Sequence, residues 1–309
     1  MKSRFINIKN INIIILLIIA FFISFNNNFD SSFEEFEETA RARENLLREH
    51  IQISSSFIKN MSIYGNLFFE NEDVIDNKYF SLLTYEDESN IFSLESINGT
   101  QYEKEAGNIT GLGQIPEKGI IRDELNLALQ YNNFFSSHYE KYPDVAWLYY
   151  TSESNFINMF PWVSSKDFIY SEKLKTVEFF KVANPENNPQ RKIVWTSAYI
   201  DHAGKGLMVT LSAPVYDNDI FKGVVSLDLT NVWLNNIINS NYDSYLVDVT
   251  DTILATSSKS MASDQISKLY DLSEVSKSDV EKMKTYEKDK VHRLGSYYFY
   301  VASFEDTPW

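Results

Sequence analysis

The sequence contains no cysteine, and this absence excludes several kinds of chemistry. Disulfides, thiolate nucleophiles and zinc sites with cysteine ligands are ruled out. Histidine is scarce as well, and the spacings H-x-x-x-H and H-E-x-x-H do not occur. The four isolated histidines are His50, His138, His202 and His292. We therefore expect surface or core histidines rather than metal ligands, and we predict neither a metal nor another cofactor.

Motifs of common enzyme classes are also missing. There is no G-x-S-x-G motif, and "GKG" at 204–206 lacks the spacing of a phosphate-binding loop and predicts a hairpin turn. "DNDIFKG" at 217–223 begins like a calcium loop, but Phe221 occupies its third ligand position and no glutamate follows at the required place. These absences favour binding over catalysis. A hydrolase with two carboxylates as acid and base is the enzyme alternative.

Positive charge is in short supply. The chain has 28 lysines and arginines against 43 aspartates and glutamates, a formal net charge of -15. So acidic a surface repels phosphate backbones, which argues against a nucleic-acid partner. Hydrophobic residues make up 44% and aromatic residues 15%, which indicates a folded core. The 309 residues suffice for one large domain, or for two ordinary domains and a helix.

One long apolar run lies near the N-terminus. Ile11–Phe25 carries no charge, follows Lys2, Arg4 and Lys9, and is about the shortest segment that spans a bilayer. No small-residue cleavage pattern follows it, so we predict an uncleaved membrane anchor rather than a signal peptide. The basic flank predicts a cytoplasmic tip. Residues after about 28 are then expected outside the inner membrane, in the periplasm.

Hydrophobic periodicity predicts helices and strands along the rest of the chain. Phe33–Phe69 is a long amphipathic helix whose charged first half suggests a stalk or a homodimer seam, and Ile121–Tyr139 is a second helix. Two strands flank a polar turn at 152–154, and further strands are predicted over 192–201, 207–216, 222–229 and 296–306. Short helices are predicted over 171–183, 231–240 (capped by Thr230) and 273–288, and a hairpin over 243–258.

This order predicts an α+β fold, in which an antiparallel sheet carries helices on one face. We divide the chain into a cytoplasmic tip and anchor (1–28), a long helix (29–75), a membrane-distal domain (76–238) and a smaller membrane-proximal domain (239–309). The last of these ends after one late strand. It is expected to be incomplete, so that the chain is a fragment of a longer protein.

Two predicted strands place acids beside polar or aromatic residues. Alternation puts Trp195, Tyr199 and Asp201 on one face of the strand 192–201. In the strand 222–229 it puts Val224, Ser226 and Asp228 on one face, and Val225, Leu227 and Leu229 on the other. An acid on a central strand is unfavourable unless something pairs with it. The partner is either a ligand or a lysine of the chain, Lys181 or Lys192; capping of the helix after Thr230 is a further alternative.

The stretch Asn184–Thr230 resembles the distal half of double Cache (dCACHE) sensor domains of bacterial transmembrane receptors. The matching pattern is "WT…Y.D..GKGLM.T…PVY" followed by "F.GVV..D". The resemblance implies a long N-terminal helix with two PAS-like antiparallel-sheet subdomains, the second truncated here. It also implies a receptor region that senses a small molecule and is not itself an enzyme. The missing output would be a diguanylate cyclase, which we favour, a histidine kinase or a chemoreceptor signalling domain.

The resemblance further implies which residues bind the ligand. Tyr199, Asp201 and Asp228 match the family's ligand residues by position. The preceding segment departs from the "R-x-W-Y" of members that bind amino acids, because Val177, Phe179 and Phe180 replace its arginine, tryptophan and tyrosine.

Without a bidentate guanidinium, an α-amino acid is a poor ligand. Lys181 is a candidate to hold an organic acid, or else the two acids hold an amine inside an aromatic box. The aromatic candidates for this box are Trp162, Tyr170 and Phe179. Trp195 is a further candidate ligand residue, with plain packing in the core as its alternative. A structural ectodomain without a ligand is the remaining alternative.

Overall fold

The computed structural model describes residues 29–71, 74–143, 145–201, 205–258, 266–271, 276–295, 297–304 and 307. The predicted cytoplasmic tip and anchor, residues 1–28, lie outside them. Within these ranges no helix is both long enough and apolar enough to cross a membrane.

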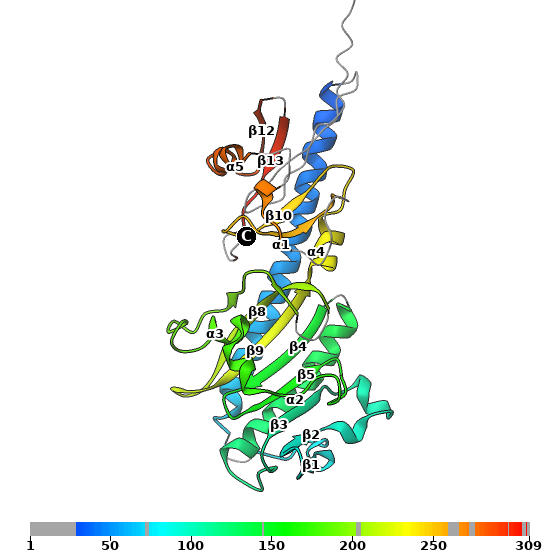
Figure 1. Cartoon of the computed structure of the whole chain (residues 1–309), viewed down its shortest axis with the longest axis vertical. Helices are drawn as coiled ribbons and strands as arrows, with labels where there is room; N and C mark the ends of the chain where they lie inside the picture. Colours follow the sequence, from blue (N-terminus) through cyan, green and yellow to red (C-terminus); the bar gives the residue numbers. More distant parts are fainter. Residues whose placement is uncertain are drawn as a thin grey trace, which may run out of the picture.

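Helix α1 (Phe29–Phe68, 40 residues) runs along nearly the whole molecule and confirms the long helix predicted from periodicity (Figure 1). Its buried stripe includes Phe36, Leu47 and Ile58, as expected for a helix with one apolar face. Gly65 lets the helix pass close to its neighbours, because a Cβ there would lie only 2.7 Å from a methyl group of Val215.

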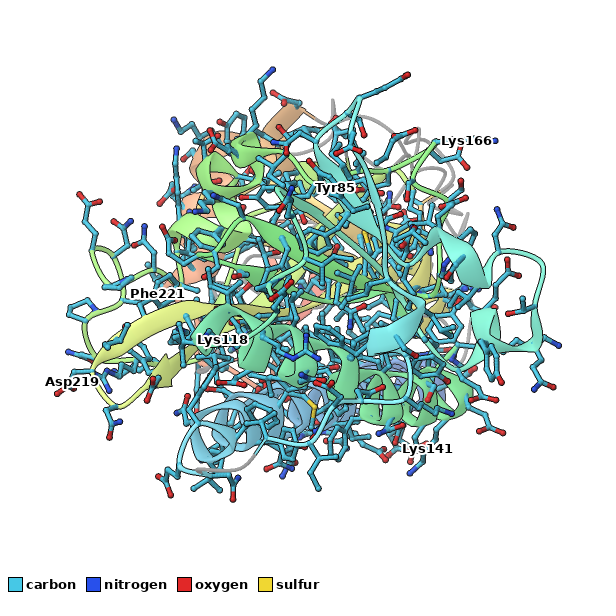
Figure 2. All side chains as sticks on the ribbon, turned by 90° about the horizontal axis from the view of Figure 1, so that it is seen from below. Tyr85, Lys118, Lys141, Lys166, Asp219 and Phe221 are labelled. Atoms are coloured by element: carbon cyan, nitrogen blue, oxygen red, sulfur yellow. The ribbon has the colours of Figure 1, made fainter. Side chains whose placement is uncertain are left out.

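A nine-stranded antiparallel sheet forms the largest part of the molecule. Its order is β1-β2-β3-β5-β4-β9-β8-β6, and β7 also pairs with β8. The strands are β1 (Thr84–Glu86), β2 (Ile91–Ser93), β3 (Asn108–Leu112), β4 (Val145–Ser152), β5 (Phe156–Phe160), β6 (Val194–Trp195), β7 (Tyr199–Ile200), β8 (Leu207–Asp217) and β9 (Ile220–Thr230). Asp219 and Phe221 mark the tip of the hairpin made by β8 and β9 (Figure 2).

The two faces of this sheet are covered differently. Helices α1 and α2 (Ile120–Lys141) pack on one face. The other face is covered by loops, by the short helix α3 (Glu178–Lys181) and by the 3-10 helix η4 (Glu172–Thr176). Strand β9 alternates as predicted: Val225 and Leu227 join the core on the helix side, and Val224 joins the opposite one. The predicted α+β class is therefore confirmed.

The predicted continuous strand over 192–201 is wrong. Trp195 pairs with Leu211, and Tyr199 pairs with Met208. From the first pair to the second, the segment 195–199 advances by four residues while β8 advances by only three. This extra residue is a β-bulge, and it reverses which face the following side chains point to. Trp195 consequently belongs to the core on the helix side, whereas Tyr199 packs on the opposite side.

The C-terminal region holds two small sheets beside α1. Helix α4 (Asn231–Ile238) follows β9 directly, and the Thr230 hydroxyl accepts a hydrogen bond from the Trp233 N–H at 3.2 Å, which confirms the predicted cap. The remaining elements are β10 (Tyr245–Val247), β11 (Ile253–Thr256), α5 (Lys277–Lys284), β12 (Lys290–Leu294) and β13 (Tyr297–Val301). Further 3-10 helices are η1 (Phe80–Leu82), η2 (Glu95–Ile97), η3 (Gln101–Lys104) and η5 (Leu269–Asp271).

The sequence missed β12, which pairs with β13 in a hairpin. This hairpin is tied to α1, because Tyr300 donates its hydroxyl proton to Glu44 and Arg48 donates to the Ser303 carbonyl at 2.7 Å. The domain boundaries drawn at residues 75 and 238 stay predictions.

Candidate ligand-binding site

A small cavity lies on the sheet face that α1 and α2 do not cover. Its volume is about 40 Å³, room for a few water molecules. The lining residues are Trp147, Tyr149, Ile157, Met159, Phe168, Leu174, Val177, Phe179, Tyr199, Asp201 and Asp228. Four of the predicted site residues are therefore brought together: Phe179, Tyr199, Asp201 and Asp228.

Asp228 sits on β9 between β4 and β8 and is only 3% exposed. Its Oδ1 accepts hydrogen bonds from the Tyr149 hydroxyl at 3.0 Å and from the Thr210 hydroxyl at 2.6 Å. Because the Thr210 proton goes to Asp228, the Tyr199 hydroxyl is the donor in its 2.6 Å contact with Thr210. These hydroxyls form a short chain that ends on one carboxylate oxygen.

No described residue donates a hydrogen bond to the other oxygen of Asp228, Oδ2, and no lysine or arginine of the described ranges lies within ion-pairing distance of it. Burial is the main cause that raises the pKa of Asp228 to about 8, and the two hydroxyl donors only partly offset it. Among the described residues no cation forms an ion pair with the buried acid, although the more distant charge of Lys205 also lowers its pKa.

Asp201 follows β7 and is held by its own hairpin. Its Oδ2 accepts from the Lys205 backbone N–H at 2.8 Å and from the Trp147 indole N–H at 3.3 Å. The Lys205 ammonium lies 3.6 Å from the centre of the Trp147 ring and donates to the Ala146 carbonyl at 2.7 Å. Burial lowers the pKa of Lys205, and the charges of both acids partly oppose this.

Aromatic side chains supply much of the cavity wall. The rings of Tyr149 and Phe179 meet edge to face, with centroids 5.1 Å apart. Burial raises the pKa of both Tyr149 and Tyr199 well above the usual value, so both phenols stay neutral and act as donors at physiological pH. The chemistry of the site is that of a small aromatic pocket with two acids.

The other predicted site residues lie elsewhere. Trp195 lines a groove beside α1, and Lys181 lines a surface pocket away from the cavity. Tyr170 is buried on the same face as the cavity, where its hydroxyl donates to Asn155 at 3.2 Å, and Trp162 packs against the core on the helix side. Neither Lys181 nor Lys192 forms an ion pair with Asp228. The alternative that one of these two lysines is the partner of Asp228 is therefore wrong.

Several lining residues escaped the sequence analysis. Trp147 and Tyr149 alternate on β4, directly beside Asp228 on β9, and Thr210 faces Asp228 from β8. The alternation on β4 is a usable signal, but it points to Asp228 only once the pairing of β4 with β9 is known. Phe168, Leu174 and Val177 come from a stretch without strands and carry no such signal.

Residues 122–239, which include the cavity's two acids, match the family described as "Methyl-accepting chemotaxis protein-like, first PDC sensor domain". Over these residues the match confirms the prediction of a Cache-type sensor domain with the function of a ligand-sensing receptor domain. The kind of output that the sensor domain controls is not specified by this match.

Solved structures with a similar course of the chain are sensory domains of chemoreceptors. The sensory domain of Campylobacter jejuni Tlp3 (CcmL) with isoleucine is 13% identical, covers 90% of this chain and 94% of its own, and has a TM-score of 0.48. The ligand-binding domain of Pseudomonas aeruginosa PAO1 PctC with GABA is 16% identical, with coverages of 60% and 81% and a TM-score of 0.40. Both scores are below 0.5, so their ligands are not transferred to this chain. No curated protein matches it.

Proposed function

We propose that the sensor domain binds a small molecule with a positively charged amine, held in the cavity by Asp228 and Asp201. The observation that carries this proposal is Asp228 itself. It is buried on a central strand, borders a cavity, accepts hydrogen bonds from two hydroxyls, and has no described lysine or arginine within 4.0 Å. A buried carboxylate of this kind gains most from a cationic partner, and a ligand ammonium supplies one.

The walls of the cavity suit an ammonium group. Cations are attracted to the faces of tryptophan, tyrosine and phenylalanine, and Trp147, Tyr149 and Phe179 all border the space beside the acids. No arginine is among the lining residues that the structure describes, so a bidentate clamp for a ligand carboxylate is missing there. An amine fits this set of residues better than an organic acid does.

The cavity must enlarge before it can hold such a ligand. Ligand pockets usually enclose about 300–1,000 Å³, whereas this cavity has about 40 Å³. Phe168, Leu174, Val177 and Phe179 form most of the wall that is not part of the sheet. Outward movement of residues 164–177 would open it, and this movement would have to break the hydrogen bonds from Tyr170 to Thr110 and Asn155. Binding would favour the open arrangement.

We place this sensor outside the cell membrane, anchored by Ile11–Phe25 and paired as a homodimer along α1. We retain the division into long helix (29–75), distal domain (76–238) and proximal domain (239–309). The output is a chemoreceptor signalling domain, a histidine kinase or a diguanylate cyclase. The description of the matched family supports the first of these.

Titration calorimetry of the full 309-residue chain in detergent tests the ligand class. Ethanolamine, choline and putrescine serve as probes, with succinate as the acidic comparison. We expect at least one amine to bind, and Asp228→Asn to weaken that binding roughly 100-fold through loss of a buried charged partner. Asp87→Asn, which removes an equal charge from an exposed turn, is the matched control and should change nothing.

Two results would contradict the proposal. One is binding of succinate but of no amine; the other is an amine affinity that survives Asp228→Asn unchanged. If no small molecule raises the melting temperature of the chain, the structural role without a ligand is the better account.

A further inference from the structure

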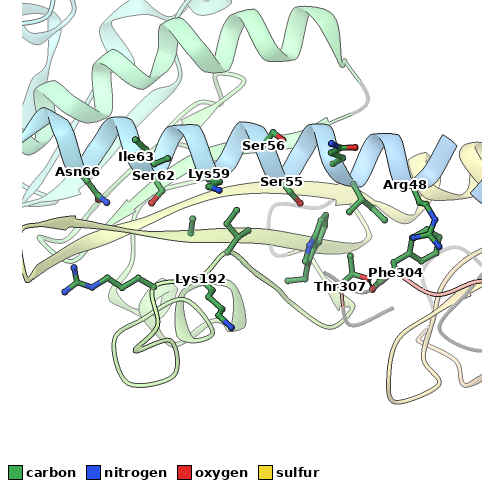
Figure 3. Close-up of a pocket in the computed structure, with 16 residues that line it drawn as sticks. Arg48, Ser55, Ser56, Lys59, Ser62, Ile63, Asn66, Lys192, Phe304 and Thr307 are labelled. Atoms are coloured by element: carbon green, nitrogen blue, oxygen red, sulfur yellow. Dashed lines mark hydrogen bonds between the residues drawn. The ribbon is translucent and has the colours of Figure 1, made fainter. Parts of the chain in front are cut away.

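A second and larger hollow lies on the opposite face of the sheet, between α1 and the edge at β6. This groove has a volume of about 800 Å³. Figure 3 shows Lys59, Ser62 and Asn66 on the helix side and Lys192 on the strand side. Trp195, the residue that the bulge turned toward the helix side, lies in its wall.

The charge of the groove opposes the charge of the protein. Its lining includes Arg48, Lys59, Arg191 and Lys192 but no aspartate or glutamate among the described residues. The whole chain, by contrast, has 43 acidic and 28 basic residues. A concave surface lined by one sign of charge concentrates ions of the other sign.

Only part of this positive charge is neutralised within the protein. Arg48 pairs with Glu44 at 2.6 Å, and Arg191 pairs with Asp219 at 2.7 Å. Lys59 and Lys192 have no carboxylate within 4.0 Å in the part of the chain that the structure describes. The two lysines therefore give the described lining of the groove a net positive charge.

The rest of the lining combines polar groups with apolar surface. The side chains of Gln52, Ser55 and Ser56 make no hydrogen bond to any described residue, so they are available to a ligand. Apolar surface comes from Ile51, Ile63, Ile193, Trp195 and Phe304. Such a mixture suits a ligand with an organic body rather than a bare inorganic ion.

We propose that this groove binds a soluble organic polyanion, such as a tricarboxylate or a phosphorylated compound, between Lys59 and Lys192. Its volume lies within the range of about 300–1,000 Å³ that is usual for small-molecule sites. A membrane phospholipid is not the favoured source of the anion. Residue 48 is already about 28 Å along α1 from Phe29, at 1.5 Å per residue, and the groove continues from there to Asn66.

This site differs from the amine cavity in face, charge and lining residues. The two cavities share no lining residue, because one is bordered by α1 and β6 and the other by η4, α3 and the far face of the sheet. A polyanion would contact α1 and the sheet edge at once, so it would fasten the long helix to the sensor domain.

The test is titration calorimetry of the full chain with citrate, and separately with inorganic phosphate, at one fixed ionic strength. The double variant Lys59→Gln, Lys192→Gln should weaken citrate binding at least tenfold. The matched control is Lys118→Gln, Lys166→Gln, which removes the same charge from exposed positions away from the groove and labelled in Figure 2. It should keep the affinity within twofold.

Three results would overturn the inference: no binding of citrate, equal weakening in both double variants, or unchanged binding in the groove variant. Tighter binding of phosphate than of citrate would also contradict it, since the site would then select a bare ion. Amine binding should be the same in the groove variant as in the unchanged chain, which separates a failure of this inference from a failure of the proposed function.

Discussion

Two buried carboxylates on opposite faces of one sheet are treated very differently by this fold. Tyr149 and Tyr150 are neighbours on β4 and point to opposite faces. The hydroxyl of Tyr149 donates to Asp228, and the hydroxyl of Tyr150 donates to Glu124 at 2.8 Å. One strand therefore serves both acids.

The two acids differ in the groups that surround them. Glu124, on α2, also accepts from Ser152 and Ser154, and the Lys222 ammonium lies 3.7 Å away. Burial raises the pKa of Glu124, while the three hydroxyls and Lys222 oppose that rise. Asp228 accepts from two hydroxyls and borders a cavity, and no described lysine lies within 4.0 Å of it. Glu124 has an ion-pair partner within the protein, whereas Asp228 has none among the described residues.

The largest expected effect is on stability. Glu124→Ala leaves Lys222 buried without its carboxylate, and breaking one side of a buried pair lowers the free energy of unfolding by about 3–5 kcal/mol. Asp228→Asn should change it by less than about 1 kcal/mol, because no buried cation is stranded. Urea denaturation of both variants at pH 7 makes the comparison. Equal losses would show that Asp228 is as structural as Glu124.

The second effect is on the pH dependence of amine binding. Since the pKa of Asp228 is about 8, the group is mostly protonated at pH 6, and a cationic amine must displace that proton. Affinity should rise by up to roughly tenfold per pH unit from pH 6 to 8 and level off above pH 8, where Asp228 is already ionised. It should not fall again below about pH 10, because the amine itself stays charged up to there.

Calorimetry at pH 6, 7, 8 and 9, in buffers that differ in ionisation enthalpy, measures both the affinity and the released proton. Asp228→Asn should bind weakly and without this rise. A constant affinity between pH 6 and 8 would mean that Asp228 does not exchange its proton for the ligand.

The smallest effect comes from removing one hydroxyl on each face. Tyr150→Phe takes a hydrogen bond from a completed buried acid and should lower the free energy of unfolding by about 1.5 kcal/mol. Tyr149→Phe should affect stability less. It removes a donor that lowers the pKa of Asp228, so amine affinity at pH 7 should fall several-fold. Thermal unfolding and calorimetry of the two variants give the comparison. A larger loss of stability in Tyr149→Phe, or a loss of amine affinity only in Tyr150→Phe, would contradict the roles given to the two acids.

Local regularities predicted the parts of this molecule that depend on them. The period of two in β9 placed Asp228 opposite Leu227 and Leu229, and the threonine before α4 predicted where that helix begins. Both depend only on residues close in sequence. The convergence of Asp201 and Asp228 on one cavity also agrees with the expectation drawn from the family resemblance.

Long-range pairing decided what the sequence could not predict. A single extra residue between Trp195 and Tyr199 exchanged their faces, and nothing in "WTSAY" marks a bulge. Tyr149 meets Asp228 only because β4 and β9 are neighbours in the sheet. The groove was equally hidden, since its described lining comes from segments within 48–66 and 191–195 and from residues 213, 304 and 307.

Helix α1 touches both ends of the described molecule. It packs on β8 near Ser62, which donates to the Pro214 carbonyl at 2.6 Å, and it meets the C-terminal hairpin through Glu44 and Arg48. Because α1 is one unbroken helix of 40 residues, a small tilt at one end gives a larger displacement at the other end. With its pivot at Asn66, a tilt of roughly three degrees would carry Phe29 through about 3 Å, given 1.5 Å of rise per residue. An adjustment too slight to notice beside the sheet thus becomes a displacement as large as many signalling proteins use.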